Sequence, residues 1–341
     1  VNTGDCCERA DFANVDIDLY CKSWKDLKSI DNPESAPFVI ASIDIECYSS
    51  TGKFPDPKVR DDACFQIAIS LVRFGETEPF EKRCLCYKET YKNLDDDSII
   101  ELYMTEKDML IRFSNYLTEK DIDVITGWNI FGFDLEYIIE RGHLMSCPLS
   151  FFKMSKLKTH VCDLMPKKLS SSALGDNELK LVPMPGRFIF DLFHEVKREY
   201  KLDSYKLDNV SKLYLGDNKI DMAPKEMFRR YEQEDPVKLR EVAEYCIKDT
   251  LLPHRLISKL CTFINLLEMA KATWVPLSYL VERGQQIKVF SQLTKKAREM
   301  KFKVPTYDYG HTDNTWYVVA TVLEAMSGAY YTPITALDFE A

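Results

Sequence analysis

The sequence predicts an α/β protein in which helices cover a mixed β-sheet. Apolar segments of strand length come first, and helical and strand-like segments then alternate along the chain. The hydrophobic fraction of 45% is ordinary for a globular protein, so a sizeable core is expected and disorder is not.

The first predicted strands follow a polar N-terminal stretch that ends in the Pro-bounded linker DNPESAP. The segment FVIASIDIECYSS at residues 38–50 predicts a buried strand, and ACFQIAISLVRF and KRCLCY predict two more. These strands are consistent with an antiparallel, hairpin-connected meander at the start of the sheet.

Two helices and a strand come next. TEKDMLIRFSNYLTEKD predicts a helix that Thr105 caps, with Asp108 in the capping-box position. DVITGW predicts a short buried strand, and FDLEYIIERGHL predicts a helix that we expect to end at Gly142.

The remainder of the chain is mainly helical. Residues 173–178 have the composition of a tight turn and suggest a protruding hairpin, and RFIFDL predicts another strand. Residues 224–272 have a helical pattern, in which Pro236 and Pro253 are expected to cause breaks or kinks.

Two carboxylates interrupt the first apolar strand. Side chains alternate along a strand, so Asp44 and Glu46 share one face while Ile43 and Ile45 point into the other layer. Neighbouring carboxylates on an apolar strand repel each other and resist burial. We therefore expect a divalent metal ion between them.

Further carboxylates follow in two later segments. Asn129 and Asp134 lie in GWNIFGFD, where a strand ends and a helix begins. Tyr245 and Asp249 are four residues apart, hence neighbours on one helical face. Taken alone, Asp134 is equally consistent with a helix cap, and the Tyr–Asp pair is consistent with an ordinary solvated helix face.

Together, DIE on a strand, NxxxFD after a strand and YxxxD on a helix resemble the three exonuclease motifs of family B DNA polymerases. GRFIFDLF, KLDSYKLDNVSKLYLG and GAYYTPITALDF also resemble segments of that family. The amino-acid sequences of these segments are similar to those of delta-type eukaryotic enzymes and of enzymes from large DNA viruses, algal viruses in particular. The resemblance covers essentially the whole chain.

The resemblance implies a ribonuclease-H-like exonuclease of the type with four acidic residues and a Tyr in the third motif. Asp44, Glu46, Asp134 and Asp249 match the ligands of two divalent ions, and oxygen ligands suit Mg²⁺ or Mn²⁺. Tyr245 matches the tyrosine that helps to orient the attacking water.

The resemblance also implies roles for three residues at the DNA end. Asn129 and Phe133 match groups that position a frayed 3′ end, and Phe54 is a candidate for stacking on the terminal base. Core packing remains the alternative for both phenylalanines. Asp338 matches the first metal-binding aspartate of the polymerase palm, although Ala341 departs from the family pattern.

These matches predict the 3′→5′ proofreading exonuclease of a replicative DNA polymerase. We expect the end of an N-terminal domain at 1–37, the exonuclease domain at 38–272 and a truncated start of the palm at 273–341 in a fragment of a longer protein. The expected partners are a primer-template with a single-stranded or frayed 3′ end, the rest of the polymerase chain and, as a further candidate, a sliding clamp. The alternatives are a free-standing nuclease of the same type and a nuclease-dead DNA-binding module.

Net charge and cysteine content constrain the kind of binding partner and the cellular compartment. A net charge of −9 argues against a generally basic nucleic-acid binder, but an acidic metal site contributes negative charge of its own. The eleven cysteines lack a metal-finger spacing, and the sequence has no signal peptide and no apolar run of membrane-spanning length. We therefore expect a reducing intracellular compartment, either the nucleus or a viral replication site, and no membrane partner.

Overall fold

The computed structural model describes residues 7–23, 35–92, 97–171, 175–217, 222–304 and 326–335. The chain divides into two compact units, Val1–Leu293 and Thr294–Ala341, and the sheet and its helices belong to the first. The division falls within α9 (Gln286–Glu299), the last helix among the described residues.

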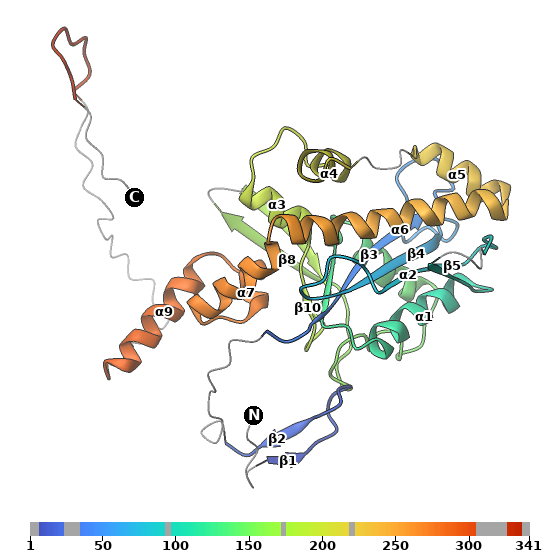
Figure 1. Cartoon of the computed structure of the whole chain (residues 1–341), viewed down its shortest axis with the longest axis horizontal. Helices are drawn as coiled ribbons and strands as arrows, with labels where there is room; N and C mark the ends of the chain where they lie inside the picture. Colours follow the sequence, from blue (N-terminus) through green and yellow to red (C-terminus); the bar gives the residue numbers. More distant parts are fainter. Residues whose placement is uncertain are drawn as a thin grey trace. The chain divides into compact units, whose positions relative to one another are not determined.

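A mixed six-stranded sheet forms the centre of the first unit (Figure 1). Its spatial order is β10-β7-β3-β4-β5-β6, in which β3 pairs antiparallel with β4 and parallel with β7. The strands are β3 (Val39–Cys47), β4 (Cys64–Arg73), β5 (Glu81–Cys86), β6 (Ser98–Leu102), β7 (Val124–Gly127) and β10 (Phe188–Ile189). The predicted fold class and the β3-β4-β5 meander are thus confirmed.

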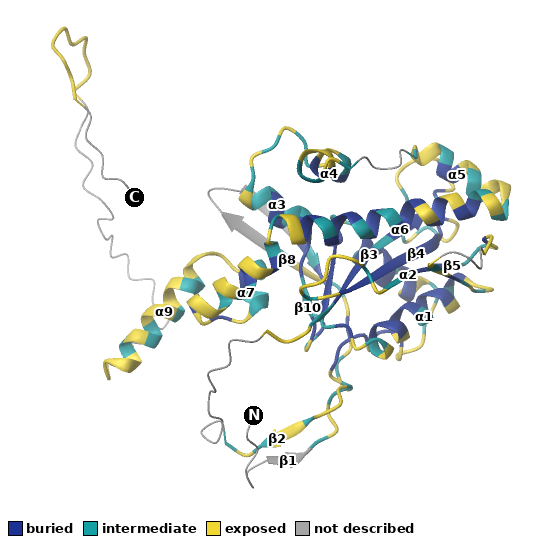
Figure 2. Cartoon of the chain, viewed as in Figure 1, coloured by how far each residue is buried: buried dark blue, intermediate teal, exposed yellow. Residues whose placement is uncertain are grey.

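Helices cover both faces of this sheet. The alternating residues Ile43 and Ile45 of β3 join a buried cluster with α1 (Glu106–Glu119) and α2 (Asp134–Leu144). The opposite face, including Ala68 of β4, packs on the long helix α6 (Pro236–Lys259). Figure 2 shows the central strands buried between these helices.

Local signals account for several helix ends. Thr105 is the N-cap of α1 and its side chain accepts a hydrogen bond from the Asp108 amide, as predicted. Asp235 caps α6 in the same way, and Pro236 occupies the first turn, where no amide donor is needed. Pro236 therefore marks a helix boundary, whereas Pro253 lies inside α6, which continues to Lys259 as one helix.

The predicted end of α2 at Gly142 is wrong. The helix continues to Leu144, and Gly142 is buried inside it. A Cβ atom at Gly142 would lie 2.2 Å from Cε1 of Phe151, so the glycine makes room for this ring. The glycine at position 142 is therefore explained by its close packing against Phe151 and not by a role in ending the helix.

The remaining elements surround this framework. The predicted hairpin is confirmed, since β8 (Met165–Ser171) and β9 (Gly175–Leu181) pair antiparallel. The predicted position of its turn, residues 173–178, is wrong in part, because residues 175–178 are paired within β9. The others are β1 (Cys7–Arg9), β2 (Leu19–Cys21), α3 (Leu192–Glu199), α4 (Leu207–Leu215), α5 (Pro224–Gln233), α7 (Thr262–Thr273) and α8 (Leu277–Glu282). No helix in the described part of the chain combines the length and apolar character needed to span a bilayer.

Candidate metal centre

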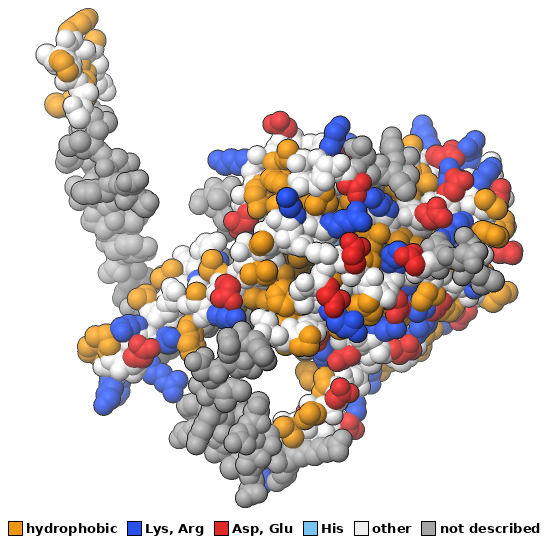
Figure 3. Space-filling model, viewed as in Figure 1, with side chains coloured by type: hydrophobic (Ala, Val, Ile, Leu, Met, Phe, Trp, Pro, Cys, Tyr) orange, Lys and Arg blue, Asp and Glu red, His pale blue; other side chains and the backbone are white. Residues whose placement is uncertain are grey.

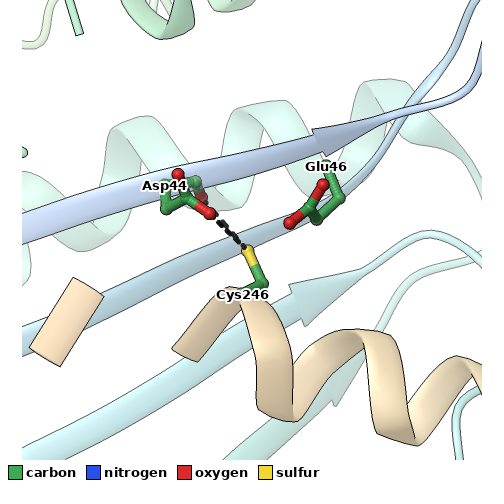
Figure 4. A group of neighbouring side chains, drawn as sticks. All are labelled: Asp44, Glu46 and Cys246. Atoms are coloured by element: carbon green, nitrogen blue, oxygen red, sulfur yellow. Dashed lines mark hydrogen bonds between the residues drawn. The ribbon is translucent and has the colours of Figure 1, made fainter. Parts of the chain in front are cut away.

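Strand β3 presents two acidic side chains toward α6. Ile43 and Ile45 fill the core on the other face, so the strand alternation leaves Asp44 and Glu46 pointing at the helix, as Figure 4 shows. The pairing of β3 with β4 shifts register between Glu46 and Cys47, a local irregularity of the kind that re-aims side chains near functional sites. Glu46 is buried, with 7% of its surface exposed.

Helix α6 places a thiol against this pair. Cys246 Sγ lies 3.4 Å from Oδ2 of Asp44 and 3.5 Å from the Asp44 carbonyl oxygen, within donating distance of both (Figure 4). Ligand atoms of Asp44, Glu46 and Cys246 all lie within 4.8 Å of one another. This group could hold a metal ion.

Tyr245 and Asp249 face the same carboxylates from α6. Both side chains are buried, and the pKa of Tyr245 is raised by burial first and then by the negative charges of Asp249, Glu46 and Asp44. The Tyr–Asp pair therefore does not lie on a solvated helix face. Residues from β3 and α6 share one electrostatic environment.

Asp134 approaches this environment from α2. It is the first residue of the helix and is 4% exposed, while Phe133 is the N-cap and makes no side-chain capping bond. Burial, followed by the charges of Asp191 and Asp249, raises the Asp134 pKa to about 7, and a hydrogen bond from the Ile45 amide opposes the shift. Asp134 thus contacts β3 and experiences the charge of Asp249.

The acidic side chains that cluster at this site have the properties of a cation-binding site. Buried carboxylates that raise each other's proton affinity are unstable as anions unless positive charge is supplied. Their oxygen atoms are the ligands that hard divalent cations prefer. The donor set at β3, α2 and α6 therefore fits a divalent metal ion.

The turn that contains Asn129 is held in place by the buried carboxylate of Asp191. Its φ angle is +65°, in the left-handed region. Asp191, which is 1% exposed, accepts hydrogen bonds from the amides of Asn129, Phe131 and Phe193 at 2.8, 2.9 and 3.0 Å. Asp191 thus fixes the loop after β7 to the start of α3. Burial raises its own pKa to about 7.

A cleft of about 750 Å³ opens beside the acidic group. Four predicted site residues line it, namely Asp44, Asn129, Tyr245 and Asp249. The other lining residues are Trp128, Phe193, Tyr205, Lys206, Leu207 and Asp208. The cleft therefore combines an acidic floor with aromatic walls.

Phe54 and Phe133 do not line this cleft and instead contact each other. Their ring centroids are 5.1 Å apart in an edge-to-face arrangement, and Phe133 also packs on Tyr137 at 5.2 Å. Phe54 is 77% exposed, which excludes core packing for this ring, whereas Phe133 is partly buried against the core. Asp338 lies outside the described residues.

Two buried residues at the site escape prediction from the sequence. Asp191 lies near the end of the predicted strand RFIFDL and is the N-cap of α3 in the structure, so its place at a strand-to-helix junction was an available signal. Cys246 had no comparable signal, because its contact with Asp44 depends on how α6 lies on the sheet.

Two family models match parts of this chain. Residues 6–210 match the exonuclease domain of DNA polymerase family B, and residues 275–341 match the family B polymerase model. The chain belongs to DNA polymerase family B and contains its exonuclease domain.

Relatives of this chain are DNA polymerases of a virus and of eukaryotes. A DNA polymerase of Paramecium bursaria Chlorella virus NY2A is 37% identical over 96% of this chain and 36% of the relative. DNA polymerase delta catalytic subunits of Dictyostelium discoideum and Schizosaccharomyces pombe are 37% and 35% identical, over 95% and 96% of this chain. The chain spans only 29% and 30% of those two subunits.

Proposed function

We propose that this region is a 3′→5′ proofreading exonuclease that removes misincorporated nucleotides from a DNA primer strand. The convergence of Asp44 and Glu46 on β3 with Tyr245 and Asp249 on α6 carries this proposal. The match to the exonuclease domain, at residues 6–210, contains Asp44 and Glu46 and adds support. The products would be nucleoside monophosphates.

Asp44, Glu46, Asp134 and Asp249 are proposed to hold two divalent cations, Mg²⁺ or Mn²⁺. When bound, such ions neutralise charge on the scissile phosphate and lower the pKa of the attacking water. The fit of the buried carboxylate oxygens and the raised pKa of Asp134 support this assignment.

Tyr245 is proposed to orient the attacking water. Its burial and the surrounding carboxylates raise its pKa, so the phenol keeps its proton at neutral pH and can both donate and accept hydrogen bonds. Glu46 is a second group that could hold this water through an acceptor oxygen.

Asn129, Phe133 and Phe54 are proposed to position the frayed 3′ end. Asn129 lines the cleft, and the exposed ring of Phe54, backed by Phe133, offers a face or edge to a base. A paired end must first lose its stacking and pairing before it can enter such a site.

The whole protein is proposed to be a DNA-directed DNA polymerase. The match at residues 275–341 supports this, and Asp338 is proposed as a metal ligand of an incomplete palm site. We further propose the boundaries 1–37, 38–272 and 273–341 for the N-terminal, exonuclease and palm parts. A primer-template, the rest of the chain and a sliding clamp are the proposed partners, and the nucleus or a viral replication site is the proposed location.

Neither alternative accounts for the chain as well. A free-standing nuclease does not explain the match to the polymerase model at residues 275–341. A nuclease-dead module does not require the buried carboxylates of Glu46, Asp134 and Asp249, or a cleft lined by Asp44 and Asp249.

Anomalous diffraction from crystals soaked in Mn²⁺ tests the proposed metal site. We expect two Mn²⁺ peaks among the carboxylates of Asp44, Glu46, Asp134 and Asp249. Crystals of the Asp44→Ala, Glu46→Ala double variant, soaked in parallel, are the control and should lack both peaks. Peaks only at other carboxylates would refute the assignment.

A further inference from the structure

The thiol of Cys246 lies among the proposed metal ligands, yet the proposed hydrolysis does not use it. The side chain is completely buried, and Sγ lies 3.4 Å from Oδ2 of Asp44. Mg²⁺ takes oxygen ligands, so a sulfur atom at this position contributes nothing to its coordination. The thiol adds a ligand of a different chemical class.

The spacing of these atoms matches the coordination shell of zinc. Zn–S bonds of about 2.3 Å and Zn–O bonds of about 2.0 Å, at a tetrahedral angle, put sulfur and oxygen about 3.5 Å apart. The 3.4 Å between Cys246 Sγ and Asp44 Oδ2 is close to that value. Glu46 adds a third ligand atom, since all three lie within 4.8 Å of one another.

The ligand chemistry also favours Zn²⁺ over Mg²⁺ and Mn²⁺, the ions proposed for hydrolysis. Thiolates select soft or borderline cations, and Zn²⁺ binds mixed sulfur and oxygen sites more tightly than Mn²⁺ does. Three protein ligands with one open position are a common zinc arrangement.

We propose that Asp44, Glu46 and Cys246 form a Zn²⁺ site whose occupation blocks the exonuclease. On binding, the S–H bond of Cys246 breaks, an S–Zn bond forms and the proton passes to solvent, without any change of oxidation state. Zinc then engages the carboxylates of Asp44 and Glu46, which are no longer available to Mg²⁺. The inference rests on the proposed function for its inhibitory effect, but not for the binding itself.

Titration with Cd²⁺, a spectroscopic substitute for Zn²⁺, tests the site directly. Cadmium bound to a thiolate produces an ultraviolet charge-transfer band that oxygen ligands do not produce. We expect one equivalent of Cd²⁺ to give this band in the wild-type chain and in Cys261→Ser, which removes an exposed thiol elsewhere. Zn²⁺ should abolish the band by competition.

The band should be lost in Cys246→Ser and Cys246→Ala. Because loss of a supporting group around a metal ligand already weakens binding about 10- to 100-fold, loss of the ligand itself should cost at least as much. Glu46→Gln leaves the thiol in place and should weaken Cd²⁺ binding by a similar factor, so the test stands even if the Cys246 variants do not fold.

Two results would overturn the inference: a band that persists in the Cys246 variants, or no band in the wild-type chain. Mg²⁺-dependent DNA degradation, measured on each sample before and after Cd²⁺ is added, separates the two proposals. A chain that degrades DNA but shows no Cys246-dependent band refutes the zinc site alone. A chain that degrades no DNA in Mg²⁺ before any Cd²⁺ is added refutes the exonuclease, whereas full degradation with one equivalent of Cd²⁺ bound refutes the block.

Discussion

Tyr245 illustrates how one residue can act on the substrate water without binding metal. It lies one helical turn before Asp249 and lines the same cleft. Its hydroxyl offers one donor and acceptor lone pairs, which suit a water molecule better than a cation. This assignment leads to a prediction that separates turnover from metal affinity.

Tyr245→Phe should lower turnover while leaving metal affinity nearly unchanged. Poor orientation of the water should reduce the rate by up to about 100-fold, since small misplacements of reacting groups cost that much. Single-turnover degradation and a calorimetric Mn²⁺ titration measure the two quantities. A large loss of Mn²⁺ affinity with unchanged turnover would contradict the assignment.

The raised pKa of Asp134 predicts that the stability of the metal-free chain depends on pH. Its pKa in the folded chain is about 7, above the ordinary value of 3.8, so folding is favoured by the protonated form. The contribution of this group to stability is therefore full below about pH 4 and is lost as the pH rises toward 7.

Asp134→Asn, which is neutral at every pH, should stabilise the metal-free chain at about pH 8 by a few kcal/mol. The gain should shrink as the pH falls and vanish near pH 4. Urea denaturation in EDTA at several pH values measures this difference. An equal effect at all pH values would show that the charge of Asp134 is not the cause.

At the scale of elements, helix α2 depends on a glycine inside its last turn. A Cβ atom at Gly142 would lie 2.2 Å from the buried ring of Phe151, so Gly142→Ala must displace the ring or the helix. Overpacking of this kind costs about 1–3 kcal/mol.

Urea denaturation of Gly142→Ala should therefore show a loss of about 1–3 kcal/mol. Gly284→Ala is the matched control, because no atom lies within 4 Å of a Cβ at Gly284, and it should be nearly neutral. Equal stability of the two variants would mean that Phe151 moves aside without cost.

Local elements were predictable because their signals are local. The cap at Thr105, the start of α6 at Pro236 and the β8-β9 hairpin depend on residues a few positions apart. The role of Gly142 was not predictable, because it depends on Phe151, which packs on α2 from beyond the end of the helix.

The same distinction holds for the candidate site. Strand alternation predicted that Asp44 and Glu46 share a face, and the resemblance selected Asp134, Tyr245 and Asp249. The hydrogen bonds that Asp191 accepts from the loop after β7, and the position of the Cys246 thiol, depend on contacts between distant segments. A single sequence does not reveal such contacts.

At the scale of the whole molecule, the acidic net charge does not produce an evenly acidic surface. Figure 3 shows basic and acidic side chains interspersed over the visible face. Much of the charge that matters for the proposed function is buried, since Glu46, Asp134 and Asp249 are all at most 7% exposed. A net charge of −9 is therefore compatible with action on DNA.

Degradation of labelled primers in Mg²⁺ tests the central claim most directly. Fraying a matched 3′ end costs a few kcal/mol that a mismatch largely removes, so the wild-type chain should cut a mismatched end roughly 10- to 100-fold faster. The Asp44→Ala, Glu46→Ala variant should fold and release no nucleotide from either primer. Equal rates on matched and mismatched ends would contradict proofreading, and near wild-type activity in the double variant would contradict the site itself.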